Sequence, residues 1–120
     1  MSETRVDLRA HVNIPIQLLG SDSRSPRVAM ETINISAGGA YCRVPEHVSL
    51  RSQIRVRIDL PSGEDVKPIV TDAIVLRVIS EEAGREGFVV ALYFLNLSFE
   101  DRHQLQEFVF GHITSESSTR

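Results

Sequence analysis

The chain has 120 residues, which is enough for one domain rather than two. Hydrophobic residues make up 42% of it and charged residues 24%, values typical of a globular protein that exclude disorder over most of the chain. With 13 Lys and Arg against 16 Asp and Glu, the formal net charge is -3, which argues against a protein that binds nucleic acid through bulk positive charge.

Period-two alternation of apolar and polar residues predicts six strands between polar or Gly/Pro-containing turns. The fourth strand has the clearest pattern, with Ile54, Val56, Ile58 and Leu60 on one face. Six short strands in a chain of this size favour a small antiparallel β-barrel, so the fold class is mainly β. The strands are expected at residues 12–19, 27–35, 40–44, 53–60, 68–79 and 88–97.

The period changes after the last strand. Ser98 and Asp101 match the [ST]-x-x-[DE] capping box, and an apolar stripe of Leu105, Phe108 and Val109 follows, which predicts a C-terminal α-helix over 102–112. The domain organisation expected from these patterns is a flexible arm (1–8), a barrel with its helix (9–113) and a disordered tail (114–120).

Residues that catalyse reactions or bind metals are not found at recognisable spacing. Cys42 is the only cysteine, so we expect a core residue and neither an intrachain disulfide nor a cysteine metal site. The four histidines lack ligand spacing, and neither a GxSxG nor a GxxxxGK[ST] motif occurs. We therefore expect no enzyme and no cofactor.

The N-terminal residues carry no apolar signal segment, and no stretch approaches the roughly 20 apolar residues of a membrane span. We therefore expect a cytoplasmic protein without membrane insertion. Its positive charge is unusual, because Lys67 is the only lysine and every other basic residue is arginine. Codon bias would explain this, and so would arginines that bind phosphate or guanine through their planar guanidinium.

Two short motifs flank the first predicted strands. Arg5 and Arg9 form an RxxxR in the predicted arm, and Asn34, Ser36 and Gly39 form an NxSxxG at a turn between two strands. Neither is specific alone, since an arginine-rich chain contains RxxxR by chance and Asn, Ser and Gly are ordinary turn residues.

In this order, with about 25 residues between them, the two motifs resemble the signature of the PilZ domain, the bacterial receptor module for cyclic di-GMP, which is RxxxR followed by [DN]xSxxG. Residues 9–16, 34–41 and 90–98 are also similar to the family's strands, so that the resemblance spans about residues 5–112. It implies a six-stranded antiparallel barrel with a C-terminal helix, in agreement with the strand count.

The resemblance implies roles for the motif residues. Arg5 and Arg9 would clamp phosphate and guanine, whose paired acceptors match the guanidinium fork. Asn34 would use its carbonyl or its amide towards a guanine edge, and Ser36 would donate to a phosphate or accept from a guanine amine. Gly39 would let the backbone approach the ligand without a Cβ in the way.

Three further residues bear on this site. Asp7 adds a negative charge near two phosphates, and Ala91 stands where relatives often carry Gly, a difference that concerns packing. Arg77 is interpreted as an exposed strand residue, with stacking on a base as the alternative.

The function implied is a cyclic di-GMP effector that changes conformation on binding and signals to an unidentified partner protein, for example in the control of motility, biofilm or virulence. The alternative is an adaptor of the same fold that does not use nucleotide. A small-barrel binder of single-stranded nucleic acid is disfavoured, because such sites need a basic groove with stacked aromatics and the chain has no Trp. We therefore expect neither DNA nor RNA as a partner.

Overall fold

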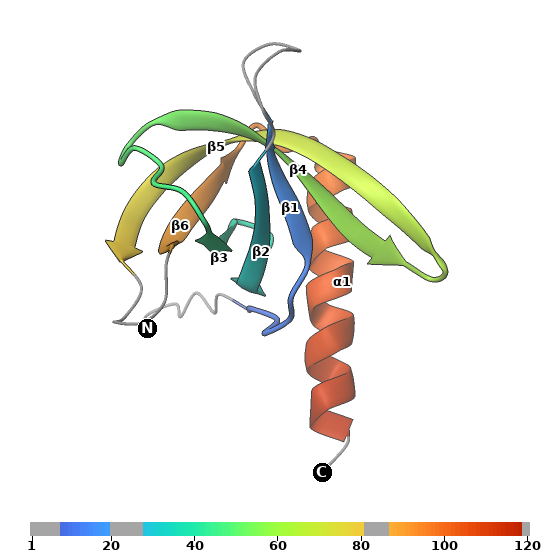
Figure 1. The fold of residues 1–120 in the computed structure, drawn as a ribbon. Helices are drawn as coiled ribbons and strands as arrows, with labels where there is room; N and C mark the ends of the chain where they lie inside the picture. The colour runs from blue at the N-terminus through green and yellow to red at the C-terminus, as the bar shows by residue number, and fades with distance from the viewer. Residues whose placement is uncertain (1–7, 20–27, 81–86, 119–120) are drawn as a thin grey trace, which may run out of the picture.

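The computed structural model describes residues 8–19, 28–80 and 87–118. It contains a closed β-barrel and one helix that lies beside it (Figure 1). The barrel order is β1-β2-β3-β6-β5-β4, and all neighbouring strands are antiparallel. The predicted fold class, a six-stranded antiparallel barrel with a C-terminal helix, is confirmed. The elements are β1 (Pro15–Leu19), β2 (Val28–Ile35), β3 (Gly39–Val44), β4 (Gln53–Ser62), β5 (Asp65–Ser80), β6 (Phe88–Leu95) and α1 (Phe99–Ser118).

Aliphatic side chains from every strand fill the barrel. In β4 the predicted alternation is observed, since Val56, Ile58 and Leu60 are buried while the intervening residues are more exposed. β-branched residues suit such a core because they pack well on a pleated surface. The fully buried side chains from the strands and the segment before β1 include Ile14, Ile16, Ile35, Val44, Val56, Ile58, Ile69, Val75 and Val90.

Two β-bulges change the phase of the alternation. In β2 the register shifts between Thr32 and Asn34, so Ile33 is the extra residue. In β5 it shifts between Val75 and Arg77, so Leu76 is the extra residue and its side chain is 58% exposed. A bulge reverses which residues face inward beyond it. This explains why Ile35 is buried although it is out of phase with Met30 and Thr32.

The segment just before β1 is hydrogen-bonded to the side chain of Thr32 in β2. Pro15 has no N–H to donate and stands first in β1, which starts three residues later than the sequence predicted. The buried hydroxyl of Thr32 accepts from Ile14 N at 2.7 Å and donates to Val12 O at 2.5 Å. Further upstream, Ala10 and Ile35 exchange two backbone hydrogen bonds of 2.9 and 3.0 Å. These bonds attach the chain near residue 10 to the end of β2.

The β4–β5 hairpin is longer than expected. The ladder runs from Gln53 paired with Ile74 to Ser62 paired with Asp65, whereas the sequence predicted a break at Pro61. A two-residue loop closes it, with Gly63 at φ 62° in the first position, as tight hairpin loops require.

The helix α1 begins at Phe99, directly after the capping residue Ser98 and three residues before the predicted start. Ser98 Oγ accepts from Asp101 N at 3.0 Å, which satisfies one of the unpaired N–H groups of the first turn. Leu105 and Val109 are buried in the same cluster as the strand residues, and Phe108 packs against it, so the predicted apolar stripe is confirmed. Within the described residues no helix is both long and apolar enough to cross a membrane.

The helix continues to Ser118, where the sequence predicted a disordered tail from residue 114. The composition of that segment suggested disorder, but no Pro or Gly occurs after Gly111, and Ser, Thr and Glu cost only a few tenths of a kcal/mol each in a helix. Once nucleated, a helix propagates at little cost per residue. The last two residues of the predicted tail, and the predicted arm apart from Leu8, lie outside the described residues.

Leu105→Ala is expected to lower the free energy of unfolding by about 2–5 kcal/mol, because Leu105 is fully buried between α1 and the barrel and its truncation leaves a cavity. Phe99→Ala serves as a control on the same helix, since that ring is 86% exposed. Urea denaturation followed by circular dichroism measures both. Similar losses in the two variants would mean that the helix does not pack as described.

Candidate ligand-binding site

Arg9 and Asn34, one residue from each sequence motif, are in direct contact. Arg9 Nη1 donates to Asn34 Oδ1 at 2.7 Å, a short bond typical of a charged donor. The backbone bridge between Ala10 and Ile35 places them side by side, because each is the chain neighbour of a bridged residue. The guanidinium carbon of Arg9 also lies 5.6 Å from the ring centroid of Tyr41, within range of a cation–π interaction.

The β2 bulge determines where Asn34 lies. Met30 and Thr32 are buried, and an unbroken alternation would bury Asn34 as well. The extra residue Ile33 shifts the phase, so Ile35 enters the core and Asn34 is only half-buried. Asn34 can therefore contact both Arg9 and a ligand outside the barrel.

Ser36 holds together the turn between β2 and β3, which we name the 36–39 turn. Ser36 is buried, with 2% of the residue exposed, and its hydroxyl accepts from the N–H groups of Gly38 and Gly39, at 3.1 and 3.2 Å. The backbone of Ser36 also donates to Gly39 O at 2.8 Å. Without ligand, the Ser36 hydroxyl stabilises a turn; its predicted contact with phosphate or guanine stays a prediction.

Gly39 is required by the neighbouring strand. A Cβ at this position would lie 2.1 Å from the carbonyl oxygen of Leu92 in β6, a distance that side chains do not adopt. At Gly38 the nearest atom to an added Cβ would be Ser36 Oγ at 3.9 Å, an ordinary contact. The close approach of β3 and β6 therefore explains Gly39 before any ligand is considered.

A shallow concavity of about 230 Å³ adjoins these residues on the outside of the barrel. Its polar part comes from Arg9 and the 36–39 turn, and its apolar part from residues of β3, β5 and β6. The β5 bulge brings Leu76 into this lining, whereas Arg77 is exposed and lies outside it. The lining residues are Arg9, Ser36, Gly38, Gly39, Tyr41, Leu76, Ala91, Leu92 and Tyr93.

Sequence reasoning identified Arg9, Ser36 and Gly39 in this lining but missed others, among them the large side chains of Tyr41, Leu76 and Tyr93. Tyr41 could have been found, because it lies two residues after Gly39 and strand periodicity places both on one face. Tyr93 is paired directly with Gly39, a relation that only the β3–β6 register reveals. Arg5 lies outside the described residues.

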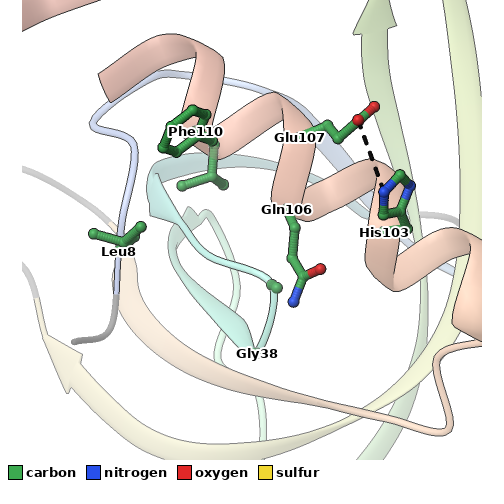
Figure 2. A pocket seen from close by; sticks show the side chains of 8 residues that line it. Leu8, Gly38, His103, Gln106, Glu107 and Phe110 are labelled. Carbon is green, nitrogen blue, oxygen red and sulfur yellow. Dashed lines mark ion pairs between the residues drawn. The ribbon is translucent and has the colours of Figure 1, made fainter. Parts of the chain in front are cut away.

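A larger hollow of about 450 Å³ lies on the other side of the 36–39 turn, against α1 (Figure 2). Gly38 lines both hollows, and in this one it faces Leu8 and the helix residues His103, Gln106 and Phe110. Neither Arg9 nor Ser36 lines the larger hollow, whereas both line the smaller concavity. We therefore take the smaller concavity, with Asn34 at its side, as the candidate site.

Cys42 is buried inside the barrel, and desolvation raises the pKa of its thiol to about 12. The thiol therefore stays protonated near neutral pH and is a core residue, as the sequence predicted. Over the described ranges, no group of three or more His, Cys, Asp or Glu side chains could hold a metal ion.

Comparisons with known proteins identify the family of the chain. The family model of the PilZ domain matches residues 3–111, which is most of the chain. The chain therefore belongs to the PilZ domain family. A comparison with curated protein sequences gives no match.

Three solved structures share the fold. The first is the Bacillus subtilis inhibitor of motility MotI/DgrA, with a TM-score of 0.78, 21% identity and coverage of 99% of this chain and 54% of that one. The PilZ domain of Escherichia coli YcgR with c-di-GMP has a TM-score of 0.69 and 15% identity, covering 98% and 97%. Escherichia coli YcgR in complex with c-di-GMP has a TM-score of 0.72 and 16% identity, covering 96% and 48%. The chain thus spans about half the length of MotI/DgrA and of that YcgR chain.

Gly39→Ala is expected to destabilise the protein by roughly 1–3 kcal/mol, because the added methyl group would force β3 away from the Leu92 carbonyl. Gly38→Ala is the matched control, with room for a methyl group, and should change stability by less than about 1 kcal/mol. Thermal unfolding of the two variants, without nucleotide, distinguishes them. Equal stability would show that Gly39 is not required by the packing of β3 against β6.

Proposed function

We propose that this chain is a receptor for cyclic di-GMP, which binds at the outer surface of the barrel to Arg9, Asn34 and the 36–39 turn. The observation that carries the proposal is the contact between Arg9 and Asn34, because it joins the two sequence motifs into one polar site next to a concavity. In this proposal Arg5 contacts the same ligand from the N-terminal segment.

The chemistry of the site suits this ligand. Cyclic di-GMP carries two phosphodiesters and two guanines, and both groups offer paired acceptors to a guanidinium fork. Tyr41 and Tyr93 supply aromatic surface for a base, and Tyr93 is 52% exposed. The net charge of -3 does not oppose binding, since a compact dianion meets only the local charge of one or two arginines.

The comparisons support the proposal through the family and the fold. The two YcgR structures are complexes with c-di-GMP, and MotI/DgrA is an inhibitor of motility. At these identities they support the fold alone. We propose, on this basis, that nucleotide binding brings Arg5 and Arg9 onto the ligand and changes the surface near the first residues. A partner protein, as yet unidentified, would bind that changed surface.

A second candidate function is an adaptor of the same fold that does not use nucleotide. One observation favours it: Ser36 and Gly39 have structural roles that need no ligand. Their presence in the motif would then reflect the turn and the β3–β6 contact. The receptor function requires that Arg9 contribute to nucleotide affinity, whereas the adaptor function involves no nucleotide.

Arg9→Ala is expected to weaken cyclic di-GMP binding on the order of 100-fold, because charge-assisted hydrogen bonds are each worth about 1.5–3 kcal/mol. Arg9→Lys keeps the charge but loses the planar fork, so a loss of about tenfold is expected. Isothermal titration calorimetry measures both variants and Arg102→Ala, an exposed arginine on α1, as the control.

Wild-type affinity should be micromolar or tighter. No heat from the wild-type chain at tens of micromolar nucleotide would reject the receptor and favour the adaptor. Full retention of affinity in both Arg9 variants would show that the ligand binds elsewhere, and would leave codon usage as the explanation of the arginine excess.

A further inference from the structure

The outer face of β5 is apolar along much of its length. Successive residues of a strand point to opposite faces, and Ile69 and Thr71 are buried, so the alternate residues face outward. Among these, Val66 is 57% exposed and Val70 is 42% exposed. Apolar residues on both faces are typical of a strand that is covered on both sides. We name the outward residues the β5 outer row; they are Val66, Pro68, Val70, Asp72 and Ile74.

The end of the β4–β5 hairpin extends past the rest of the barrel (Figure 1). Within the described residues, β6 pairs with β5 from Asp72 onward and β1 pairs with β4 as far as Ile58, so the hairpin continues as a ribbon with two open edges. An open edge is a template for another strand. Each strand of the ribbon carries a proline, Pro61 or Pro68, which has no N–H for such pairing. The ribbon therefore offers a partner its outer face rather than its edges.

The charged side chains beside the β5 outer row carry both signs in equal number. Arg57 Nε lies 2.9 Å from Asp59 Oδ1 on the same face of β4. Arg55 Nη1 lies 3.3 Å from Asp72 Oδ1 across the β4–β5 ladder. A partner surface with one sign of charge would be attracted by half of these groups and repelled by the other half. A surface with the same mixed pattern is complementary to them.

A second copy of the chain supplies that pattern. A two-fold axis that crosses β4 between Arg57 and Asp59 brings the arginine of each copy opposite the aspartate of the other. Arg57 pairs with Val70 and Asp59 pairs with Pro68 in the ladder, so the same axis also brings Val70 opposite Pro68. One arrangement thus matches the charges and covers the apolar row.

The size of this face limits how tightly two copies can bind. From Val66 to Ile74 the row is about 27 Å long, and the flanking strands widen the face to about 15 Å. Each copy would then bury about 400 Å², roughly half of the 800 Å² per partner that is usual in a stable complex. A dissociation constant on the order of 100 μM is therefore expected.

We propose that the outer face of the β4–β5 hairpin, centred on Val70, is an interface through which two copies of this chain form a weak, two-fold symmetric dimer. The β5 outer row contributes no residue to the described lining of the candidate ligand site. The dimer does not depend on nucleotide, so it is tested separately from the receptor function.

Sedimentation velocity of the chain without nucleotide, from about 10 μM to about 1 mM, measures the dimer. The weight-average mass of the wild type should rise from that of a monomer towards that of a dimer. Val70→Lys places a charge at the centre of the apolar row, so dimerisation should weaken at least about tenfold. Phe110→Lys is the matched control, because it adds the same charge at an exposed apolar residue on α1 and should dimerise as the wild type does.

Two charge variants test the two-fold arrangement. Arg57→Asp and Asp59→Arg each leave both positions with one sign of charge, so each variant alone should repel its own copy and stay monomeric. Mixed in equal amounts, the two variants carry opposite charges at these positions and should form a heterodimer. Thermal unfolding shows whether each variant is folded.

A monomer at every concentration of the wild type would overturn the proposal and leave this face to another protein. Dimerisation of Val70→Lys as strong as that of the wild type would also overturn it, because the interface would then lie elsewhere. An equal mixture of the two charge variants that stays monomeric would contradict the two-fold pairing of Arg57 with Asp59. None of these outcomes bears on nucleotide binding.

Discussion

The bulge at Ile33 in β2 is the constraint on which the candidate site depends. It lets one strand bury Met30 and Thr32 before the extra residue and Ile35 after it, and so keeps Asn34 out of the core. Directly beyond the bulge, Ile35 pairs with Ala10 and brings Arg9 within hydrogen-bonding distance of Asn34. Two motifs 25 residues apart in sequence therefore become one polar site.

The residues of the NxSxxG motif fall into two groups. Ser36 and Gly39 are needed by the protein itself, one to close the 36–39 turn and the other to let β3 approach β6. Loss of binding after substitution of either residue would report on the turn as much as on the ligand. Asn34 and Arg9 are only half-buried and contact each other beside the concavity, so substitutions at these two positions report on ligand chemistry more directly.

Much of the fold could be predicted from the sequence, because strand and helix periodicity reflect burial on one face. The capping box at Ser98 and the alternation in β4 are local patterns, and both are observed. The bulges are not local in this sense, since an extra residue is stable only in the context of a particular neighbouring strand. Periodicity along the chain therefore could not show that Asn34 stays outside the core.

The same limit explains the other differences. Pro61 predicted a turn, yet it lies exposed within the long β4–β5 hairpin, where a missing N–H is tolerated. The contribution of Leu76 to the concavity depends on the β5 bulge, and that of Tyr93 depends on the register between β3 and β6. These contacts depend on the pairing of strands that are distant in sequence, so periodicity along the chain cannot predict them.

Nuclear magnetic resonance titration of the chain with cyclic di-GMP tests the central claim most directly, because it reports binding and the residues involved in one experiment. The account predicts saturable shifts at micromolar ligand, centred on Arg9, Asn34 and the 36–39 turn. Spectra unchanged at tens of micromolar ligand would contradict the claim, and so would shifts confined to the hollow between the turn and α1, at His103, Gln106 and Phe110.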